Sequence, residues 1–490
     1  MKTYKDHQET RRRHHADPRA DTVHRSSLLV PELPGAEVDV SFLNHFLLKR
    51  GYGNVACRVT SVDGEGRKLS SRLHPVTEPR VYRLPLTRMV PGAASHVVEF
   101  FAADNLVIPF PAVMVNHTGP DCFNSVHAYN RVLNDPFEDD AINALASPEA
   151  SIDVEDGAET FLVFMAGATG CRGALELTLA TPERVRAVRV DLDVPRLCPR
   201  VVSVSDAFGA APSGVLSVRQ PRQPMFYGRL LAGRRAPGGA FTANHSFYDS
   251  SGTEEYWTDA GESYRTYPWF ADLDARVRFY PIMSPGRLAI ALEAHGPDGR
   301  SLLRWDAGVI ESPGAAFLDV DPGVALDRAR VERRDVAAFT VRARPIDGEA
   351  PTRINHQVLY GRGGLSASLN VSLYHPSFFV PEGKTGFAWG QLPVGGDLRS
   401  RLGIVTNGPG GDPCDVVLTI YDETGEVGQK TFGLAGGGSI SVDAGDLVPR
   451  AVDDAPRWLW YIARAPRPDI TAYTLTRHER SGHSTGEHSF

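Results

Sequence analysis

Histidines are the residues of this chain whose type and spacing could support chemistry. His117 and His127 are ten residues apart, and so are His478 and His488 near the C-terminus. In both places an apolar strand is expected before the first histidine, and a small residue and an aromatic residue follow the second. Two histidines on neighbouring antiparallel strands can face each other across the ladder, near enough to share a metal ion.

Carboxylates accompany both histidine pairs. Asp121 lies in the expected loop between His117 and His127, and Glu487 directly precedes His488. Imidazoles and a carboxylate can hold zinc or iron while leaving coordination positions open for water, as a metal-dependent hydrolase or oxygenase requires. The two candidate metal sites are His117 with Asp121 and His127, and His478 with Glu487 and His488.

The same histidines have a structural interpretation. A residue that recurs in several copies of one domain can serve packing, or can satisfy a strand end by bonding a backbone carbonyl through one ring nitrogen. The histidine rings would then point apart or into the core. The sequence leaves both interpretations open.

Aromatic residues suggest a second kind of site. They crowd the stretch 248–270, which also contains several acidic residues. Exposed rings flanked by acids can stack on the faces of sugars, whereas buried rings at a junction between domains would give the same pattern. The candidate ligand-binding residues are Tyr248, Tyr256, Trp257 and Trp269.

An internal repeat indicates which elements must position these residues. His127, His245, Val371 and His488 occupy corresponding places, with spacings of 118, 126 and 117 residues. Each repeat also contains runs that alternate apolar and polar residues and end in turn residues, which is typical of half-buried strands leading into hairpins. A period near 120 residues has the size of a sandwich domain.

The chain is therefore predicted to be all-β, with about four tandem β-sandwich units that are Ig-like or jelly-roll-like. The units are expected at 27–135, 136–250, 251–376 and 377–490. His356 stands where His117 does in the third unit, and Tyr227 takes that place in the second. One short helix is expected over 135–147, and residues 1–26 are expected to form a flexible tail because they lack an apolar face.

Composition narrows the function classes. A net charge of −7 without a clustered basic face argues against nucleic-acid binding, and no apolar run reaches the length of a membrane span. Five cysteines without CxxC spacing, and no signal-like N-terminus, favour a reducing, cytoplasmic setting. Because no recognised catalytic motif appears, the favoured function is a binding or structural protein with a carbohydrate or protein partner. The alternative is the metal-dependent enzyme.

Overall fold

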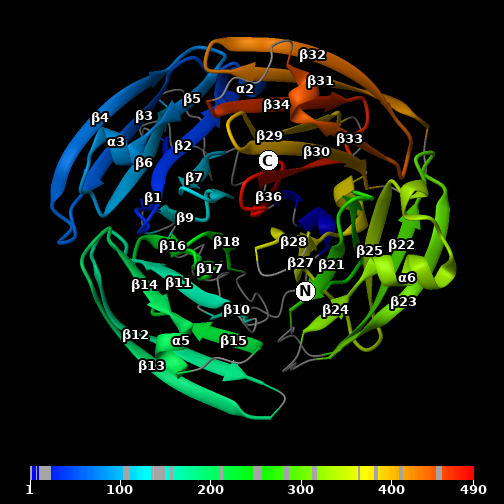
Figure 1. Ribbon diagram of the computed structural model, residues 1–490, viewed down its shortest axis with the longest axis horizontal. Coiled ribbons are helices and arrows are strands. Elements are labelled where there is room, and N and C mark those ends of the chain that lie inside the picture. Colours follow the sequence, from blue (N-terminus) through cyan, green and yellow to red (C-terminus); the bar gives the residue numbers. More distant parts are fainter. Residues whose placement is uncertain are drawn as a thin grey trace. The chain divides into compact units, whose positions relative to one another are not determined.

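Strands dominate the structure, which confirms the all-β prediction. The computed structural model describes residues 3–6, 8–9, 24–102, 111–133, 136, 139, 149–154, 158–181, 183–209, 213–246, 256–280, 286–311, 317–361, 365–379, 384–407, 412–448 and 455–490. The chain forms two compact units, drawn in Figure 1. The N-terminal unit is His7–Thr253, and the C-terminal unit is Glu254–Phe490 together with Met1–Asp6.

The first sandwich of the N-terminal unit packs one antiparallel sheet, β1-β6-β3-β4, against another, β5-β2-β7-β8; β9 and β16 extend the first sheet beside β1. Their bounds are β1 (His24–Pro31), β2 (Glu37–Leu43), β3 (Val55–Val62), β4 (Lys68–Val76), β5 (Val81–Leu84), β6 (Ser95–Ala102), β7 (Met114–Thr118), β8 (Phe123–His127), β9 (Asn130–Val132) and β16 (Phe226–Gly228).

The second sandwich pairs the sheets β10-β15-β12-β13 and β14-β11-β17-β18. Its strands are β10 (Glu149–Val154), β11 (Glu159–Met165), β12 (Cys171–Ala180), β13 (Val185–Val194), β14 (Pro199–Ser203), β15 (Gly214–Arg219), β17 (Leu231–Arg235) and β18 (Phe241–His245).

The C-terminal unit contains the third sandwich, with sheets β20-β25-β22-β23 and β24-β21-β27-β28, and a separate two-stranded sheet β19-β26. These strands are β19 (Tyr256–Trp257), β20 (Ser263–Pro268), β21 (Ala275–Phe279), β22 (Arg287–His295), β23 (Ser301–Glu311), β24 (Leu318–Val320), β25 (Ala338–Pro345), β26 (Ala350–Pro351), β27 (Ile354–Tyr360) and β28 (Ala367–Leu373).

The fourth sandwich has sheets β29-β34-β31-β32 and β33-β30-β35-β36. Its strands are β29 (Gly386–Val394), β30 (Leu398–Thr406), β31 (Cys414–Asp422), β32 (Gly425–Leu434), β33 (Ser439–Asp443), β34 (Arg457–Ala465), β35 (Ile470–His478) and β36 (Ser484–His488).

All four sandwiches have one topology. When the eight strands of each are counted in chain order, one sheet runs 1-6-3-4 and the other 5-2-7-8. The four repeat positions found in the sequence all lie on the eighth strand, in β8, β18, β28 and β36. The repeat therefore corresponds to a repeated fold.

Alternation of burial explains the strands. The residues of β3 and β22 alternate between buried and partly exposed, because successive side chains of a strand point to opposite faces and only one face meets the core. The core of the fourth sandwich shows both sheets contributing, with Leu402 and Ile404 from one sheet and Leu418 and Leu459 from the other.

Helices are short in the described part of the chain: α2 (His45–Arg50), α3 (Leu86–Met89), α5 (Val204–Phe208), α6 (Pro322–Ala329), η2 (Arg333–Asp335), η3 (Pro376–Phe379) and η4 (Ala444–Leu447). None of them is long and apolar enough to cross a membrane. Of the helix predicted over 135–147, Pro136 and Asp139 are helical and the remaining residues lie outside the described part.

Within each unit the two sandwiches touch through their eighth strands, β8 with β18 and β28 with β36. In the N-terminal unit the Ala243 amide donates to Asn124 Oδ1 at 2.8 Å. In the C-terminal unit the buried Arg265 donates through Nε to the Tyr473 hydroxyl at 2.8 Å, and that hydroxyl donates to the Thr266 carbonyl at 2.9 Å. Hydrogen bonds thus pair the polar groups buried where the two sandwiches meet.

One expectation about the strand positions was wrong. Tyr227 lies on β16, which pairs with β9, and not on the seventh strand of the second sandwich; that strand is β17. Of the predicted tail over 1–26, the Tyr4 ring lies near the Trp257 ring, with centroids 6.5 Å apart, and β1 begins at His24; residues 10–23 lie outside the described part.

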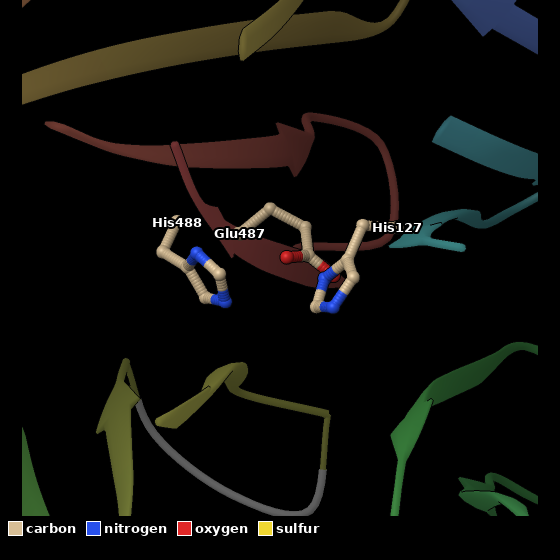
Figure 2. A group of neighbouring side chains, drawn as sticks. All are labelled: His127, Glu487 and His488. Atoms are coloured by element: carbon tan, nitrogen blue, oxygen red, sulfur yellow. The ribbon is translucent and has the colours of Figure 1, made fainter. Parts of the chain in front are cut away.

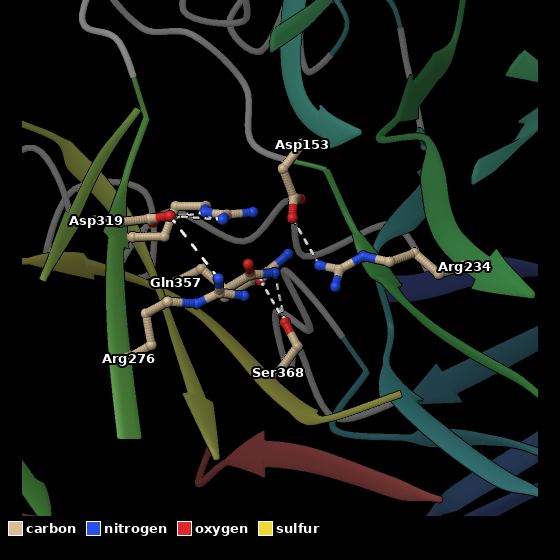
Figure 3. Close-up of polar contacts among 8 residues, drawn as sticks. Asp153, Arg234, Arg276, Asp319, Gln357 and Ser368 are labelled. Carbon is tan, nitrogen blue, oxygen red and sulfur yellow. Dashed lines mark hydrogen bonds and ion pairs between the residues drawn. The ribbon is translucent and has the colours of Figure 1, made fainter. Parts of the chain in front are cut away.

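A buried ion pair joins the two sheets of the second sandwich (Figure 3). Arg234 Nη2 on β17 lies 2.6 Å from Asp153 Oδ2 on β10, and both side chains are less than a tenth exposed. We expect Asp153→Asn to destabilise the N-terminal unit by about 3–5 kcal/mol, because it leaves a buried guanidinium without its counter-charge. Urea unfolding followed by circular dichroism measures this change.

The exposed pair Arg172–Asp193 supplies the matched control, since both of its side chains are more than three-quarters exposed. Asp193→Asn should cost less than about 1 kcal/mol. The double variant Asp153→Leu with Arg234→Met should recover most of the lost stability. Equal effects of the two asparagine variants would refute this role for the buried pair.

Candidate functional site

The hairpin register separates the first predicted metal-ligand pair. His127 on β8 is opposite Met114, whereas His117 on β7 is opposite Asn124. Met114 and His117 are three residues apart, so their side chains point to opposite faces of the sheet. His127 shares the face of Met114, because residues directly opposite each other in a ladder lie on the same face. His117 and His127 therefore do not converge on one ion, and Asp121 lies exposed in the loop between their strands.

The same parity divides the C-terminal candidates. His488 is opposite Tyr473 on β35, and His478 lies five residues further along that strand, on the other face. Glu487, opposite Thr474, shares the face of His478 at a distance of four residues. At the end of β36 the ligand atoms of Glu487 and His488 lie within 4.8 Å of each other. Figure 2 draws both side chains together with His127, which belongs to the N-terminal unit.

The histidines of the seventh strands occupy different register positions. In the third sandwich His356 is itself opposite the repeat position Val371. In the first sandwich Met114 is opposite the repeat position, and His117 lies three residues beyond it. In the fourth sandwich Tyr473 is opposite the repeat position, and His478 lies five residues beyond it. They are therefore not copies of one site, although the sequence spacing of ten suggested it for two of them.

His356 has a complete structural role inside the third sandwich. Its Nε2 is hydrogen bonded to the Tyr267 hydroxyl, its Nδ1 lies 3.4 Å from the Ile354 carbonyl, and its ring stacks on Phe279. A neutral imidazole with Nδ1–H donating and Nε2 accepting satisfies both contacts. Burial lowers the pKa of His356 to about 3 and that of His117 to about 4.

The repeated histidines at the strand ends share one contact. His245 Nδ1 lies 3.0 Å from the carbonyl of Ser246, and His488 Nδ1 lies 2.9 Å from the carbonyl of Ser489. Each ring thus donates to the residue that follows its strand. This is the strand-end role that the structural interpretation predicted.

The aromatic stretch contributes mainly to the interior. Trp269 is 4% exposed in the core of the third sandwich and donates from Nε1 to the Arg333 carbonyl at 2.9 Å. It presents no face to a ligand, so its proposed ligand-binding role was wrong. Tyr256 is half-buried on β19, and Tyr248 lies outside the described residues.

Trp257 belongs to a group of residues around Tyr4 that the sequence did not reveal. The rings of Trp257 and His375 meet edge to face, with centroids 5.0 Å apart. The Tyr4 ring stacks on His375 at 5.0 Å and 12°, and meets the Phe378 ring at 4.8 Å and 62°. The backbone amide of Tyr4 donates to the Asp259 carboxylate at 3.0 Å. We call Trp257, Asp259, His375 and Phe378 the aromatic pocket.

Hydrogen bonds orient His375 in the aromatic pocket. The Ser377 amide donates to Nδ1 at 3.0 Å, so Nε2 carries the proton and donates to Asp259 Oδ1 at 3.1 Å. Burial lowers the pKa of His375, and the neighbouring Asp259 carboxylate acts in the opposite direction. Because both ring nitrogens are engaged, His375 is set up to position Asp259 and not to transfer protons.

A polar row covers the face of the third sandwich that points away from its core (Figure 3). Arg278 forms two hydrogen bonds of 2.7 Å with Asp319, and Gln357 Nε2 donates to Ser368 Oγ at 2.6 Å and to Asn370 Oδ1 at 3.1 Å. The register places these residues side by side across β24, β21, β27 and β28. Their side chains mainly satisfy one another.

Sequence reasoning missed Tyr4, Asp259, His375 and Phe378 as a group. Tyr4 and Asp259 are 255 residues apart, and no spacing rule connects such positions. The aromatic stretch gave the one usable signal, since it contains Trp257 and Asp259. The partners from η3 and the N-terminus come from the tertiary structure.

The buried His356 makes stability depend on pH. Its pKa is about 3 when folded, far below its ordinary value, so the unfolded chain takes up the proton first as the pH falls. Stability from this residue is complete above about pH 6.5 and should decline by roughly 1.4 kcal/mol per pH unit below it. His356→Gln, which cannot titrate, should therefore lose less stability than wild type between pH 6 and 4 in urea unfolding. Parallel pH profiles would contradict a buried, neutral histidine.

Comparisons with known proteins give no family. No family model matches the chain, and no curated protein matches it. The solved structures that align with it include a Parabacteroides merdae β-glucuronidase with glycerol in its active site (14% identity, 47% of this chain, 28% of that chain, TM-score 0.14). They also include a tetra-tandem repeat from the extending region of a large adhesion protein (11% identity, 95% of this chain, 98% of that chain, TM-score 0.08). The chain thus spans little more than a quarter of the glucuronidase, and these TM-scores carry no functional information.

Proposed function

We propose that this chain is a non-catalytic binding protein that recognises an aromatic residue of a protein partner through the aromatic pocket. The observation that supports this proposal is the way in which Tyr4 occupies the pocket. Its ring contacts Trp257, His375 and Phe378, while its backbone amide donates to Asp259. A pocket that contacts both the ring and the peptide N–H suits an aromatic residue within a polypeptide.

A protein partner is favoured over a carbohydrate. Sugar stacking needs an accessible ring face, and Trp269, Tyr267 and Phe270 are each less than a twentieth exposed in the third sandwich. Trp257 is 3% exposed, and Tyr4 lies against it. Tyr4, which contacts this pocket, is part of a polypeptide.

The roles of the histidines support a non-catalytic function. His356 is hydrogen bonded through both ring nitrogens, and His245 and His488 each bond the carbonyl of the next residue. Imidazoles with these hydrogen bonds serve to orient backbone and core groups. The reducing, cytoplasmic setting belongs to the same proposal, which the free state of all five cysteines supports.

The chain carrying Tyr4→Ala tests the proposal, because it empties the pocket without altering its walls. It should be screened against short peptides whose central residue is varied within a glycine–serine context, and against an array of oligosaccharides. Peptides centred on Tyr, Phe or Trp should bind, with Kd values of roughly 0.1–1 mM for a single side chain. Trp257→Ala should abolish that binding. Binding of oligosaccharides alone would overturn the protein-partner proposal.

A metal-dependent enzyme is the second candidate, because Glu487 and His488 bring two ligand atoms within 4.8 Å. His478 would have to join them from a position four residues away along the strand. Under this proposal the ion is zinc or iron, held at the end of β36.

Elemental analysis of the full chain separates the two candidates. If His488 is structural, the purified protein should contain no stoichiometric zinc, iron, copper or manganese. His488→Ala and its repeat counterpart His245→Ala should then cost similar amounts, about 1–2 kcal/mol each, for the lost bond to a carbonyl. One bound metal per chain that His488→Ala releases and His245→Ala retains would establish the metal site instead.

A further inference from the structure

We infer that Tyr4 is an intramolecular occupant that closes the aromatic pocket, and that a partner's aromatic residue must displace it. This inference rests on the proposed function and adds its regulation. Four observations support it: the pocket's walls stand without Tyr4, the N-terminal segment is shaped to present Tyr4, the contact is small, and the occupant is tethered to the chain.

The walls of the pocket are held by contacts that do not involve Tyr4. Trp257 is anchored in β19, where it is opposite Ala350 of β26, and its ring meets His375. His375 is fixed by the Ser377 amide and by Asp259. Phe378 stacks on Tyr374 with centroids 5.2 Å apart. The pocket is therefore expected to keep its form when Tyr4 leaves.

The N-terminal segment is helical at residues 4–6 and 8–9 and has its own capping. The Thr3 amide and hydroxyl donate to Asp6 Oδ2 at 3.0 and 2.9 Å, and the Asp6 amide donates to Thr3 Oγ1 at 3.1 Å. Reciprocal bonds of this kind form a capping box. This segment holds the Tyr4 amide and ring in the orientation in which both reach the pocket.

The contact is small enough to be reversible. Tyr4 is half-buried, and the neighbouring side chains of Lys5 and Asp6 are exposed. An aromatic side chain whose backbone amide also bonds a carboxylate gives a weak complex between separate molecules. Because Tyr4 is part of the same chain, a tethered occupant of this kind can still fill the pocket most of the time.

Competition follows from this arrangement. A partner can bind only those molecules in which Tyr4 has left the pocket. Its apparent Kd therefore equals the Kd for the open pocket divided by the fraction of molecules that are open. If Tyr4 occupies the pocket about nine-tenths of the time, removing it should raise the affinity about tenfold. The N-terminal segment thus sets the threshold for partner binding.

The test compares full-length wild type with Tyr4→Ala and Tyr4→Phe. The probe is a capped Gly-Ser-Tyr-Ser-Gly peptide titrated by ligand-observed NMR, with the Leu analogue as the reference peptide. Tyr4→Ala should bind the Tyr peptide about tenfold more tightly than wild type. Tyr4→Phe keeps the ring and amide and should stay near wild type. Tyr52→Ala, which removes a half-buried tyrosine of the N-terminal unit, is the matched control and should change nothing.

The outcomes separate the two proposals. Equal affinity of wild type and Tyr4→Ala for the Tyr peptide, both stronger than for the Leu peptide, would overturn the competition while leaving the proposed function in place. No preference for Tyr over Leu in Tyr4→Ala would overturn the proposed function itself. Adding Trp257→Ala to Tyr4→Ala should remove the gain, and its persistence would place the binding elsewhere.

Discussion

Alternation of side chains along paired strands is the constraint on which this structure depends. In every sandwich one face of each sheet meets the core, so the register of a hairpin decides whether a residue is packed inside or turned outward. Parity places His117 and His127 on opposite faces, and does the same for His478 and His488. A sequence spacing of ten residues cannot reveal this, because the length of the turn between the strands sets the register. The register therefore separates the two histidines of each pair, although their spacing in the sequence is the same.

Several polar groups that the sandwiches bury are paired with one another. Asp153 and Arg234 connect two sheets, and Arg265 is held by the Tyr473 hydroxyl and lies over the rings of Tyr374 and Tyr473. Leaving any of these groups unpaired would cost about 1–3 kcal/mol, and more for a charge. His356, between Tyr267 and a backbone carbonyl, follows the same principle. His356 thus meets the hydrogen-bonding demands of a β-rich interior.

The aromatic pocket differs from these internal networks, because it is filled by a segment from the far end of the chain. Its carboxylate, Asp259, receives one hydrogen bond from a wall residue and one from the backbone of the occupant. The wall residues have contacts of their own, and Tyr4 reaches them through its ring and its amide, which suits exchange with a partner. The proposed binding function rests on this difference.

The sequence by itself determined the class of fold and its repetition. Alternating apolar residues and turn residues are local signals. His127, His245 and His488 recur because each is the last residue of the eighth strand of its sandwich. His245 and His488 also bond the carbonyl of the next residue. The contacts that those residues make depend on the tertiary structure. Register, strand order and the docking of Tyr4 depend on contacts between residues far apart in the chain, the last of them across 255 positions. Local spacing carries no information about such contacts, since their free energy arises only when the packed surfaces meet.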